Sequence, residues 1–401
     1  MKAFNFVHAS DLHLGYAQYG LETRRQDFDN AFTELVNKTI ELKPDFMIIA
    51  GDLFHHARPS NTTLENAIRN FKRLRDAEIP VLTVDGSHDS APNMITGTIL
   101  TPLDSAGLIN HLPRREGACW RKSGCCYVYG VPNFRTRRKT HEALPEFMSQ
   151  NPPSPEQSTA NIFVLHMAID IPNVTPSYIE AEASPELIPE GFGYYAAGHI
   201  HERYLGKFKS GVLAYSGCTE TASYDEAKNQ KGFYHVTVSE KGEFSPNFIE
   251  LKSPRKFIVL DEDFSGMNSA KITELAAKAV KNADTEGAVI TSVIRGVLPS
   301  ESSRAEVDVA KIRNAAEKAL FVNPLVLLKE SKVSEEIVRS IFESQIKDLK
   351  TKAYEYFLQI FSERYSREQS DQVARSALSL IEPLTRKQEA RVKQIIEELQ
   401  K

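Results

Sequence analysis

Histidine and aspartate are concentrated in five short segments of this sequence. The segments are Asp11-Leu12-His13, Gly51-Asp52-Leu53-Phe54-His55, Gly86-Ser87-His88-Asp89, the single residue His166, and Gly198-His199-Ile200-His201. Each of them follows a short apolar run of the kind that forms a β-strand. Carboxylate and imidazole groups together suit manganese, iron or zinc, whereas calcium and magnesium favour shells of oxygen alone. The pattern therefore predicts a centre that binds transition-metal ions.

The spacing of these residues suits the cleavage of phosphate esters. Asp11 and His13, like His199 and His201, are two positions apart, and on extended backbone such side chains point to the same side. Hydrolysis of a phosphodiester requires an activated water and neutralisation of phosphoryl charge, and two cations about 3.5–4 Å apart provide both. Asp52, after a strand and a glycine, is our candidate for a carboxylate shared by both ions. An isolated Asp or His is more often a turn former or surface residue, but five converging segments favour the metal interpretation.

The remaining histidines and the cysteines show no comparable pattern. A lone histidine is more often a hydrogen-bonded or surface residue than a catalyst, so we assign no role to these. The cysteines lack CxxC or similar spacing, which is typical of reduced thiols in an intracellular protein. The residues left without a function are His8, His56, His111, His141, His235, Cys119, Cys125, Cys126 and Cys218.

The elements that would position the five segments alternate along the first 251 residues. Short β-rich runs alternate with helical stretches, including apolar helix faces near residues 28–40 and 64–74, and this alternation predicts an α/β fold. In such folds the loops at the carboxyl ends of the strands converge on one crevice. Strands are expected at residues 3–9, 46–50, 81–84, 126–129, 161–165, 194–197, 212–215 and 233–238.

Two smaller regions follow this block. A Ser-Pro break at residues 252–256 precedes a small α+β pattern, with strands expected at 257–260 and 288–295 and helices at 269–281 and 309–319. Residues 331–401 then carry apolar side chains at three- and four-residue steps, which predict amphipathic helices capped at Ser334 and Thr385. Because no strand accompanies these helices, we expect their apolar faces to need a partner surface.

The composition of the 401 residues is that of a globular protein, with 41% hydrophobic and 25% charged residues. No run of 18 apolar residues occurs and the first ten residues include no basic leader, so we expect an intracellular protein that does not enter a membrane. The net charge of −4 argues mildly against DNA binding, but two bound divalent cations would offset it where phosphate docks. No G-x-x-x-x-G-K-[ST] loop is found, so ATP hydrolysis would belong to another chain.

The five segments resemble the signature of the calcineurin-like metallophosphoesterases, which reads D-x-H, G-D, G-N-H-[DE], a single His and G-H-x-H. Residues 8–15, His55 and residues 197–201 are similar in particular to the nuclease subunits of the DNA double-strand-break repair complex, called meiotic recombination eleven, or SbcD in bacteria. The resemblance implies a metallophosphoesterase β-sandwich flanked by helices in residues 1–251 and a small capping, DNA-binding domain in residues 252–330. It also implies that the helical region 331–401 binds an SMC-like ATPase of the SbcC type.

The resemblance further implies two divalent metal ions, identified as manganese, and the residues around them. Ser87 stands where the family has asparagine, so it lacks the amide carbonyl that serves as a ligand, and the second ion would be held more weakly. The ligand sets that the resemblance implies are Asp11, His13, Asp52 and His201 for one ion and Asp52, His166, His199 and the altered position Ser87 for the other.

Three further residues receive roles from the same resemblance. His88 corresponds to the histidine that assists departure of the leaving oxygen, and Asp89 is expected to orient its ring. His55 corresponds to the histidine that positions the DNA phosphate. We therefore expect a metal-dependent nuclease with His88, Asp89 and His55 as its catalytic group.

The resulting hypothesis is a manganese-dependent DNA exonuclease and endonuclease that works as a homodimer with an SMC-like ATPase. The dimer surface is expected on the helix containing Leu64 and Ile68 and on residues 95–103. Two alternatives stay open. One is a metallophosphoesterase that acts on a phosphoester other than DNA, and the other is a scaffold that binds DNA ends with a metal site impaired at Ser87.

Overall fold

The computed structural model describes residues 1–90, 97–155, 160–176, 178–299, 302–330, 349–362 and 366–385. The chain forms two compact units. The first, here called the core unit, comprises Met1–Val259, Ala283–Thr291 and Glu317–Phe321, and the second, the C-terminal unit, comprises Leu260–Asn282, Ser292–Ala316 and Val322–Lys401. All five histidine-rich segments therefore belong to the core unit.

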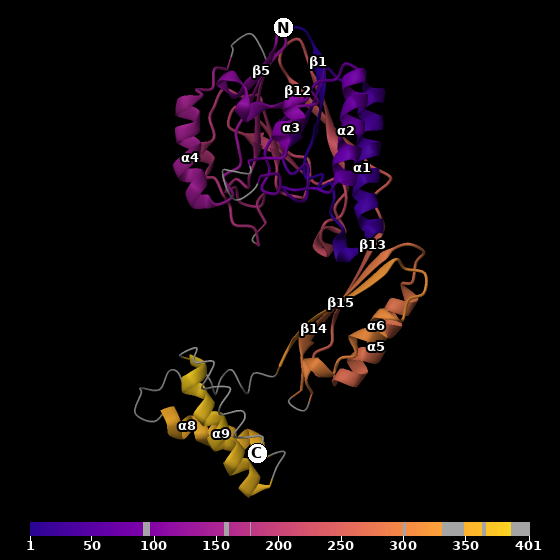
Figure 1. Cartoon of the computed structure of the whole chain (residues 1–401), viewed down its shortest axis with the longest axis vertical. Helices are drawn as coiled ribbons and strands as arrows, with labels where there is room; N and C mark the ends of the chain where they lie inside the picture. The colour runs from indigo at the N-terminus through magenta and orange to yellow at the C-terminus, as the bar shows by residue number, and fades with distance from the viewer. Residues whose placement is uncertain are drawn as a thin grey trace. The chain divides into compact units, whose positions relative to one another are not determined.

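Two six-stranded sheets form the centre of the core unit (Figure 1). The first sheet has the order β12-β11-β1-β2-β3-β4, in which β1 to β4 are parallel and β11 and β12 are antiparallel additions. Its parallel strands deliver their carboxyl ends to one edge. The strands of the first sheet are β1 (Phe4–Ala9), β2 (Phe46–Ala50), β3 (Val81–Val84), β4 (Asn110–His111), β11 (Gly232–Val238) and β12 (Phe244–Glu250).

The second sheet has the order β5-β6-β7-β8-β10-β9, with a parallel centre and two antiparallel edge strands. Its central strands also end at the edge where the histidines gather. The strands of the second sheet are β5 (Cys119–Lys122), β6 (Cys126–Gly130), β7 (Ala160–His166), β8 (Tyr194–Gly198), β9 (Tyr204–Phe208) and β10 (Gly211–Tyr215).

Alternating side chains of the strands fill three apolar layers. On β2, Phe46 and Ile48 face the second sheet, whereas Met47 and Ile49 face the helices α1 (Glu22–Leu42) and α2 (Asn61–Asp76). The outer face of the second sheet packs against α4 (Arg137–Gln150) through Leu144. Figure 1 accordingly shows α1 and α2 on one side of the sheets and α4 on the other. The predicted α/β sandwich flanked by helices is confirmed.

The helices begin and end at residues whose local chemistry explains their bounds. The Ser60 hydroxyl accepts the Thr63 N–H at 3.2 Å and caps α2, and the Thr136 hydroxyl caps α4 in the same way. Helix α1 ends at Leu42, and the left-handed backbone of the next residue, Lys43 (φ 50°), closes the last turn. The short helix α3 (Leu100–Ser105) buries Leu100 and Leu103 in the core. These two buried side chains are therefore unavailable for the dimer surface expected at residues 95–103.

The eight strands expected in residues 1–251 are all present, but the sequence pattern missed four others and helix α4. The missed strands β4, β5, β9 and β12 all lie at the edges of the two sheets. Strand β12 contains Pro246, which an edge strand tolerates because one of its sides needs no ladder hydrogen bond. These edge strands are partly exposed, and β4 and β5 are also short, so their apolar signal is weak.

A third sheet of three strands, β13 (Phe257–Asp263), β14 (Val289–Val297) and β15 (Phe321–Lys329), follows in the sequence with helices α5 (Ser269–Asn282) and α6 (Val309–Arg313). The helix expected at 309–319 is wrong beyond Arg313. The Asp284 carboxylate accepts the backbone N–H groups of residues 317–319 at 2.9–3.2 Å, which holds them in a turn. Strand β15 was missed because it contains Pro324.

Two helices near the C-terminus, α8 (Leu349–Ser362) and α9 (Arg367–Thr385), pair through Asp371, which binds the Tyr354 hydroxyl and the Arg375 guanidinium. Helix α8 confirms part of the predicted helical region. The cap at Thr385 is wrong, because Thr385 is the last residue of α9; Ser334 and the helix expected after Thr385 lie outside the described residues. No helix in the described part of the chain is long and apolar enough to span a membrane.

Candidate metal centre

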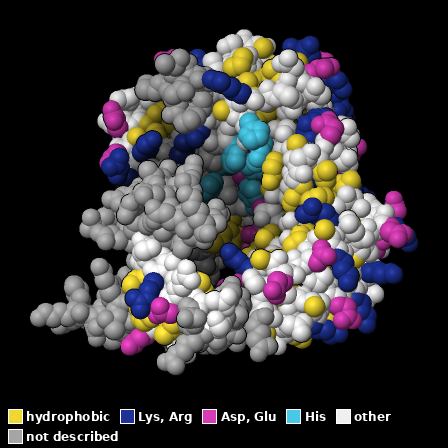
Figure 2. All heavy atoms as spheres, turned by 60° about the horizontal axis from the view of Figure 1, so that its bottom comes forward, with side chains coloured by type: hydrophobic (Ala, Val, Ile, Leu, Met, Phe, Trp, Pro, Cys, Tyr) yellow, Lys and Arg dark blue, Asp and Glu magenta, His cyan; other side chains and the backbone are white. Residues whose placement is uncertain are grey.

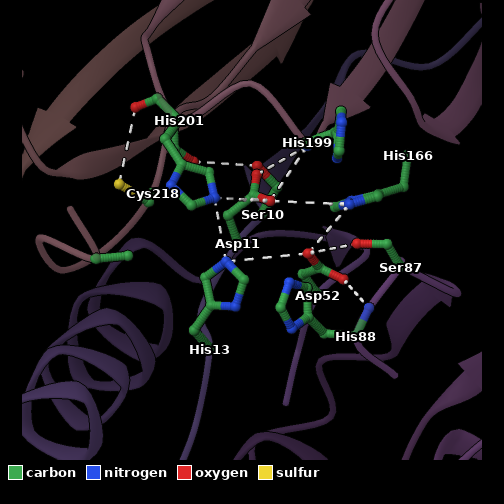
Figure 3. Close-up of polar contacts among 12 residues, drawn as sticks. Ser10, Asp11, His13, Asp52, Ser87, His88, His166, His199, His201 and Cys218 are labelled. Atoms are coloured by element: carbon green, nitrogen blue, oxygen red, sulfur yellow. Dashed lines mark hydrogen bonds and ion pairs between the residues drawn. The ribbon is translucent and has the colours of Figure 1, made fainter. Parts of the chain in front are cut away.

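The five segments meet because both sheets end their central strands at one place (Figure 3). Asp11 and His13 follow β1, Asp52 follows β2, and the Gly86–Asp89 loop follows β3. From the second sheet, His166 is the last residue of β7, and His199 comes directly after β8. Residues as far apart in the sequence as Asp11 and His201 thus become neighbours.

The backbone at this meeting point is unusual. Asp11, His13, Asp52 and His199 all have positive φ angles, between 47° and 90°. Such angles are uncommon outside glycine and are found preferentially at functional sites, where the surrounding structure holds them. A Cβ on Gly86 would overlap the Asp52 carboxylate, so glycine is required there. The loops are therefore shaped to bring polar side chains very close together.

Two overlapping groups of ligand atoms result. In the first, His166 Nε2 lies 3.3 Å from Asp52 Oδ2 and 3.9 Å from Asp11 Oδ1. In the second, His201 Nε2 lies 3.6 Å from Asp11 Oδ1 and 3.1 Å from His13 Nε2. Within each group the ligand atoms lie within 4.8 Å of one another. Asp11 belongs to both groups, and Asp52 also lies 3.9 Å from His13 Nε2.

The donor set fits metal cations. His166 Nδ1 lies 2.8 Å from the Ala50 carbonyl, which only accepts, so Nδ1 carries a hydrogen and Nε2 presents its lone pair. That Nε2 atom is buried and has no hydrogen-bond partner among the residues that the structure describes. It faces the Asp52 carboxylate, which is also an electron-pair donor. Two facing lone pairs in a buried place require a cation between them, either a proton or a metal ion.

The electrostatics of the site also call for positive charge. Burial disfavours a charged His166, yet the carboxylates of Asp52 and Asp11 outweigh burial and raise its pKa to about 10. Burial likewise opposes a charged His201, but Glu226 and Asp11 raise its pKa to about 9. Burial would raise the pKa of Asp52, but His166 and His13 hold that pKa well below its usual value. Without a metal, protons supply the positive charge that the carboxylates demand.

His88 and His55 lie on the solvent side of the two ligand groups. The exposed His88 donates its backbone N–H to Asp52 Oδ1 at 2.8 Å, and its Nδ1 lies 2.8 Å from the His55 carbonyl oxygen. The His55 ring stacks on Tyr16 with 3.8 Å between centroids and on His88 with 4.9 Å. Together with His13, these histidines form a third group of possible ligands. Sequence reasoning missed Tyr16, because no motif marks an aromatic residue that packs on a site histidine.

Asp89 does not orient the His88 ring as expected. It is fully buried and accepts the backbone N–H groups of Leu53, Phe54 and Gly86 at 3.3, 2.9 and 2.9 Å. Burial and the nearby Asp52 raise its pKa to about 7. Asp89 therefore ties the loop after β2 to the loop after β3, while the carbonyl of His55 holds the ring of His88.

Ser87 and His199 lie at the margin of the groups. The Ser87 hydroxyl donates to Asp52 Oδ2 at 3.4 Å, which is the one hydrogen bond of its side chain within the described part of the chain. The His199 backbone N–H donates to both Asp11 carboxylate oxygens at 3.0 and 3.2 Å. Its ring Nε2 lies 3.6 Å from Glu182 Oε2, and its nitrogens fall outside every group of ligand atoms found in the described chain.

Two of the unassigned histidines are buried structural residues. His111 Nε2 lies 2.7 Å from Asp85 Oδ2, just before the loop that carries His88. His8 Nδ1 lies 3.0 Å from the Tyr194 hydroxyl, and burial lowers the pKa of His8 to about 3. Figure 2 shows other histidine side chains gathered on one face of the molecule, where they reach the surface. The exposed His88 makes the centre accessible from solvent.

Comparison with known proteins gives consistent matches. The family model for calcineurin-like phosphoesterases matches residues 4–203, which include all five segments. The DNA double-strand break repair protein Mre11 of Archaeoglobus fulgidus is 30% identical over 332 residues, covering 78% of this chain and 71% of that protein. The protein of the same name from Methanocaldococcus jannaschii is 31% identical over 274 residues, covering 66% of this chain and 69% of that protein.

Proposed function

This chain belongs to the Mre11 family of DNA double-strand break repair proteins, within the calcineurin-like phosphoesterases, and from that premise we propose that it cuts DNA with manganese. Membership makes it a metal-dependent nuclease that uses divalent ions. We propose that it acts both as an exonuclease and as an endonuclease, by hydrolysis of phosphodiester bonds at a two-metal centre.

One observation carries this proposal. The buried Nε2 of His166, which has no hydrogen-bond partner in the described part of the chain, faces the carboxylate of Asp52. The Nε2 atoms of His13 and His201 lie beside the neighbouring carboxylate of Asp11. Mixed imidazole and carboxylate donors favour manganese over calcium or magnesium. The centre therefore supports divalent transition-metal chemistry at a surface that a phosphodiester can reach.

We propose the ligands that the resemblance to the phosphoesterases implies, and the two groups of ligand atoms support all of them except His199. Bound ions would neutralise phosphate charge and lower the pKa of an attacking water. Asp52 Oδ2 lies 3.3 Å from His166 Nε2 in one group and 3.9 Å from His13 Nε2 in the other, so we propose Asp52 as the shared carboxylate. Ser87 replaces an expected ligand of the second ion. The proposed ligands are Asp11, His13, Asp52 and His201 for the first ion and Asp52, His166 and His199 for the second.

We propose that His88 gives a proton to the leaving oxygen. Because the His55 carbonyl accepts from Nδ1, this nitrogen keeps its hydrogen and Nε2 is the atom that exchanges protons with substrate. The stacked Tyr16 and His88 fix the ring of His55, which we propose contacts the DNA phosphate. Proton transfer of this kind contributes roughly 10²–10⁴-fold to rate.

The direct test uses the full chain with end-labelled duplex and single-stranded DNA, in manganese or in chelator. Cleavage that requires manganese supports the proposal, and His88→Ala should remove most of it without changing manganese binding. His141→Ala, at an exposed position on α4, serves as the matched control. Hydrolysis of small phosphoesters without DNA cleavage would instead favour the first alternative. Binding of DNA ends without any hydrolysis would favour a scaffold impaired at Ser87.

The larger assembly is also part of the proposal. We propose the boundaries 1–251 for the nuclease domain, 252–330 for a capping, DNA-binding domain and 331–401 for the region that binds an SMC-like ATPase in an intracellular repair complex. We propose a homodimer through α2, where Leu64 and Ile68 are only partly buried against the core. Leu103 is excluded from this surface because only 2% of it is exposed.

A further inference from the structure

We propose that Glu226 is a positioning residue of the metal centre, which holds the His201 ring so that Nε2 faces the metal. Glu226 lies in the 3₁₀ turn Tyr224–Glu226, beyond the region matched by the family model, and no motif in the sequence marks it. This inference rests on the proposed function, because that function supplies the metal.

The geometry places His201 between Glu226 and the ligand group. On one side, Nδ1 of His201 lies 2.6 Å from Glu226 Oε1. On the other side, Nε2 lies 3.6 Å from Asp11 Oδ1 and 3.1 Å from His13 Nε2. An ionised carboxylate only accepts hydrogen bonds, so Nδ1 carries the hydrogen and the lone pair for a metal is on Nε2. Glu226 thus selects both the orientation and the tautomer of the ring.

Glu226 is itself held rigidly. Its Oε2 accepts the Ala222 N–H at 3.1 Å and contacts Lys231 Nζ at 3.5 Å and Cys218 Sγ at 3.4 Å. Glu226, Lys231 and Cys218 are all buried. Cys218 Sγ also lies 3.7 Å from the His201 carbonyl oxygen, as Figure 3 shows. The carboxylate therefore has little freedom to leave the imidazole, and the charge of Lys231 offsets its burial.

The arrangement differs from that at His166. The Nδ1 of His166 is held by the neutral carbonyl of Ala50, whereas the Nδ1 of His201 is held by a charged carboxylate. A carboxylate partner makes an imidazole a stronger electron-pair donor than a carbonyl does. We infer that Glu226 strengthens the metal bond of His201 in particular.

A separate metal at Glu226 is the competing explanation, since ligand atoms of His201, Cys218 and Glu226 lie within 4.8 Å of one another. However, the Lys231 ammonium lies 3.2 Å from Cys218 Sγ and 3.5 Å from Glu226 Oε2. A cation already stands there, and it would repel a divalent ion. The group is therefore a hydrogen-bonded support for His201 rather than a metal site.

The test measures binding of manganese alone, by calorimetric titration of the full chain in the absence of DNA. Glu226→Gln keeps a hydrogen-bond acceptor for Nδ1 of His201 but removes the charge. We therefore expect the affinity for one of the two manganese ions to fall about tenfold. Glu226→Ala should lower the manganese affinity further. Glu226→Asp should lower it less than Glu226→Gln does. Glu250→Gln, an exposed change on β12, is the matched control and should bind as the wild type does.

The DNA-cleavage rate adds a second readout. The defect of Glu226→Gln should be relieved by higher manganese concentration, with KM for DNA unchanged. Wild-type affinity for both ions in Glu226→Gln would overturn the inference, even if the chain cleaves DNA. A loss of manganese binding in a chain that cleaves no DNA would leave the inference standing and remove the proposed function.

A spectroscopic measurement on the wild type tests the inference if the variants do not fold. If Glu226→Gln and Glu226→Ala unfold in chelator, the ¹⁵N resonances of His201 in the zinc-loaded wild type decide instead. A hydrogen on Nδ1 is expected, and a hydrogen on Nε2 would overturn the inference.

Discussion

Replacing Ser87 by asparagine should strengthen the binding of the second metal ion. In the structure the Ser87 hydroxyl donates its hydrogen to Asp52 Oδ2, so it ties up an electron pair of the carboxylate proposed to be shared by both ions. Ser87→Asn removes this donor and introduces a carbonyl oxygen that reaches further and can itself bind a metal. Both changes favour occupancy of the ion that His166 and His199 are proposed to hold.

The size of the effect follows from the contact. Alterations of groups around a metal typically change affinity or activity by about 10–100-fold. The hydroxyl contact is long, at 3.4 Å, so its removal frees the Asp52 carboxylate only slightly, and we expect the lower end of that range. Ser87→Asn should therefore tighten manganese binding about tenfold, equivalent to about 1.4 kcal/mol, and raise the cleavage rate by a similar factor at limiting manganese.

The assay pairs manganese titration by calorimetry with the rate of cleavage of end-labelled duplex DNA across manganese concentrations. Ser87→Ala is the matched control, because it removes the hydroxyl without adding a carbonyl. If Ser87→Asn changes neither the titration nor the rate, serine is an adequate neighbour for the metal and the impaired-site hypothesis must be dropped.

Three further predictions concern the C-terminal region, the dimer and pH. Truncation after Lys332 should abolish binding of the SMC-like ATPase, measured by co-purification, while manganese-dependent cleavage by the shortened chain persists; loss of both in a folded protein would contradict the domain assignment. Leu64→Asp should give a folded monomer in sedimentation experiments, because Leu64 is only partly buried, and an unfolded product would make it a core residue instead. The pKa of His8 is lowered to about 3 by burial, from about 6.5 in the unfolded chain, so the unfolded state binds a proton that the native state refuses. Stability should therefore fall as pH drops from about 6.5 towards 3, by up to about 1.4 kcal/mol per pH unit, and urea unfolding of His8→Phe should show a flatter decline.

The parts of the site that could be predicted from the sequence are those with local signals. Asp11, His13 and Asp52 each follow a strand with a strong apolar pattern, and the strand bounds at residues 46–50 and 81–84 match the structure. Parallel strands then bring the following loops together by topology alone. The convergence of these segments needed no knowledge of individual side-chain contacts.

What could not be predicted depends on contacts between distant residues. Glu226 touches His201 across 25 positions, and Asp89 binds the backbone of a loop about 35 positions away. A glutamate in a 3₁₀ turn has the same local pattern whether it faces solvent or an imidazole. Strand β15 was missed for a different reason, because Pro324 argues against a strand unless its place at a sheet edge is known.

The two-sheet origin of the centre gives the metal a mechanical role. Asp52 extends from β2 and His166 from β7, and the layer between these strands is otherwise filled with apolar side chains such as Ile48 and Val164. A cation bound by both Asp52 and His166 would cross-link the two sheets at the edge where their strands end. Because such linkage is reciprocal, the bound ion would stabilise the packing of the two sheets, and separation of the sheets would release the ion. The two residues can share an ion only after the two sheets have packed together, so binding of that ion would report on a folded core unit.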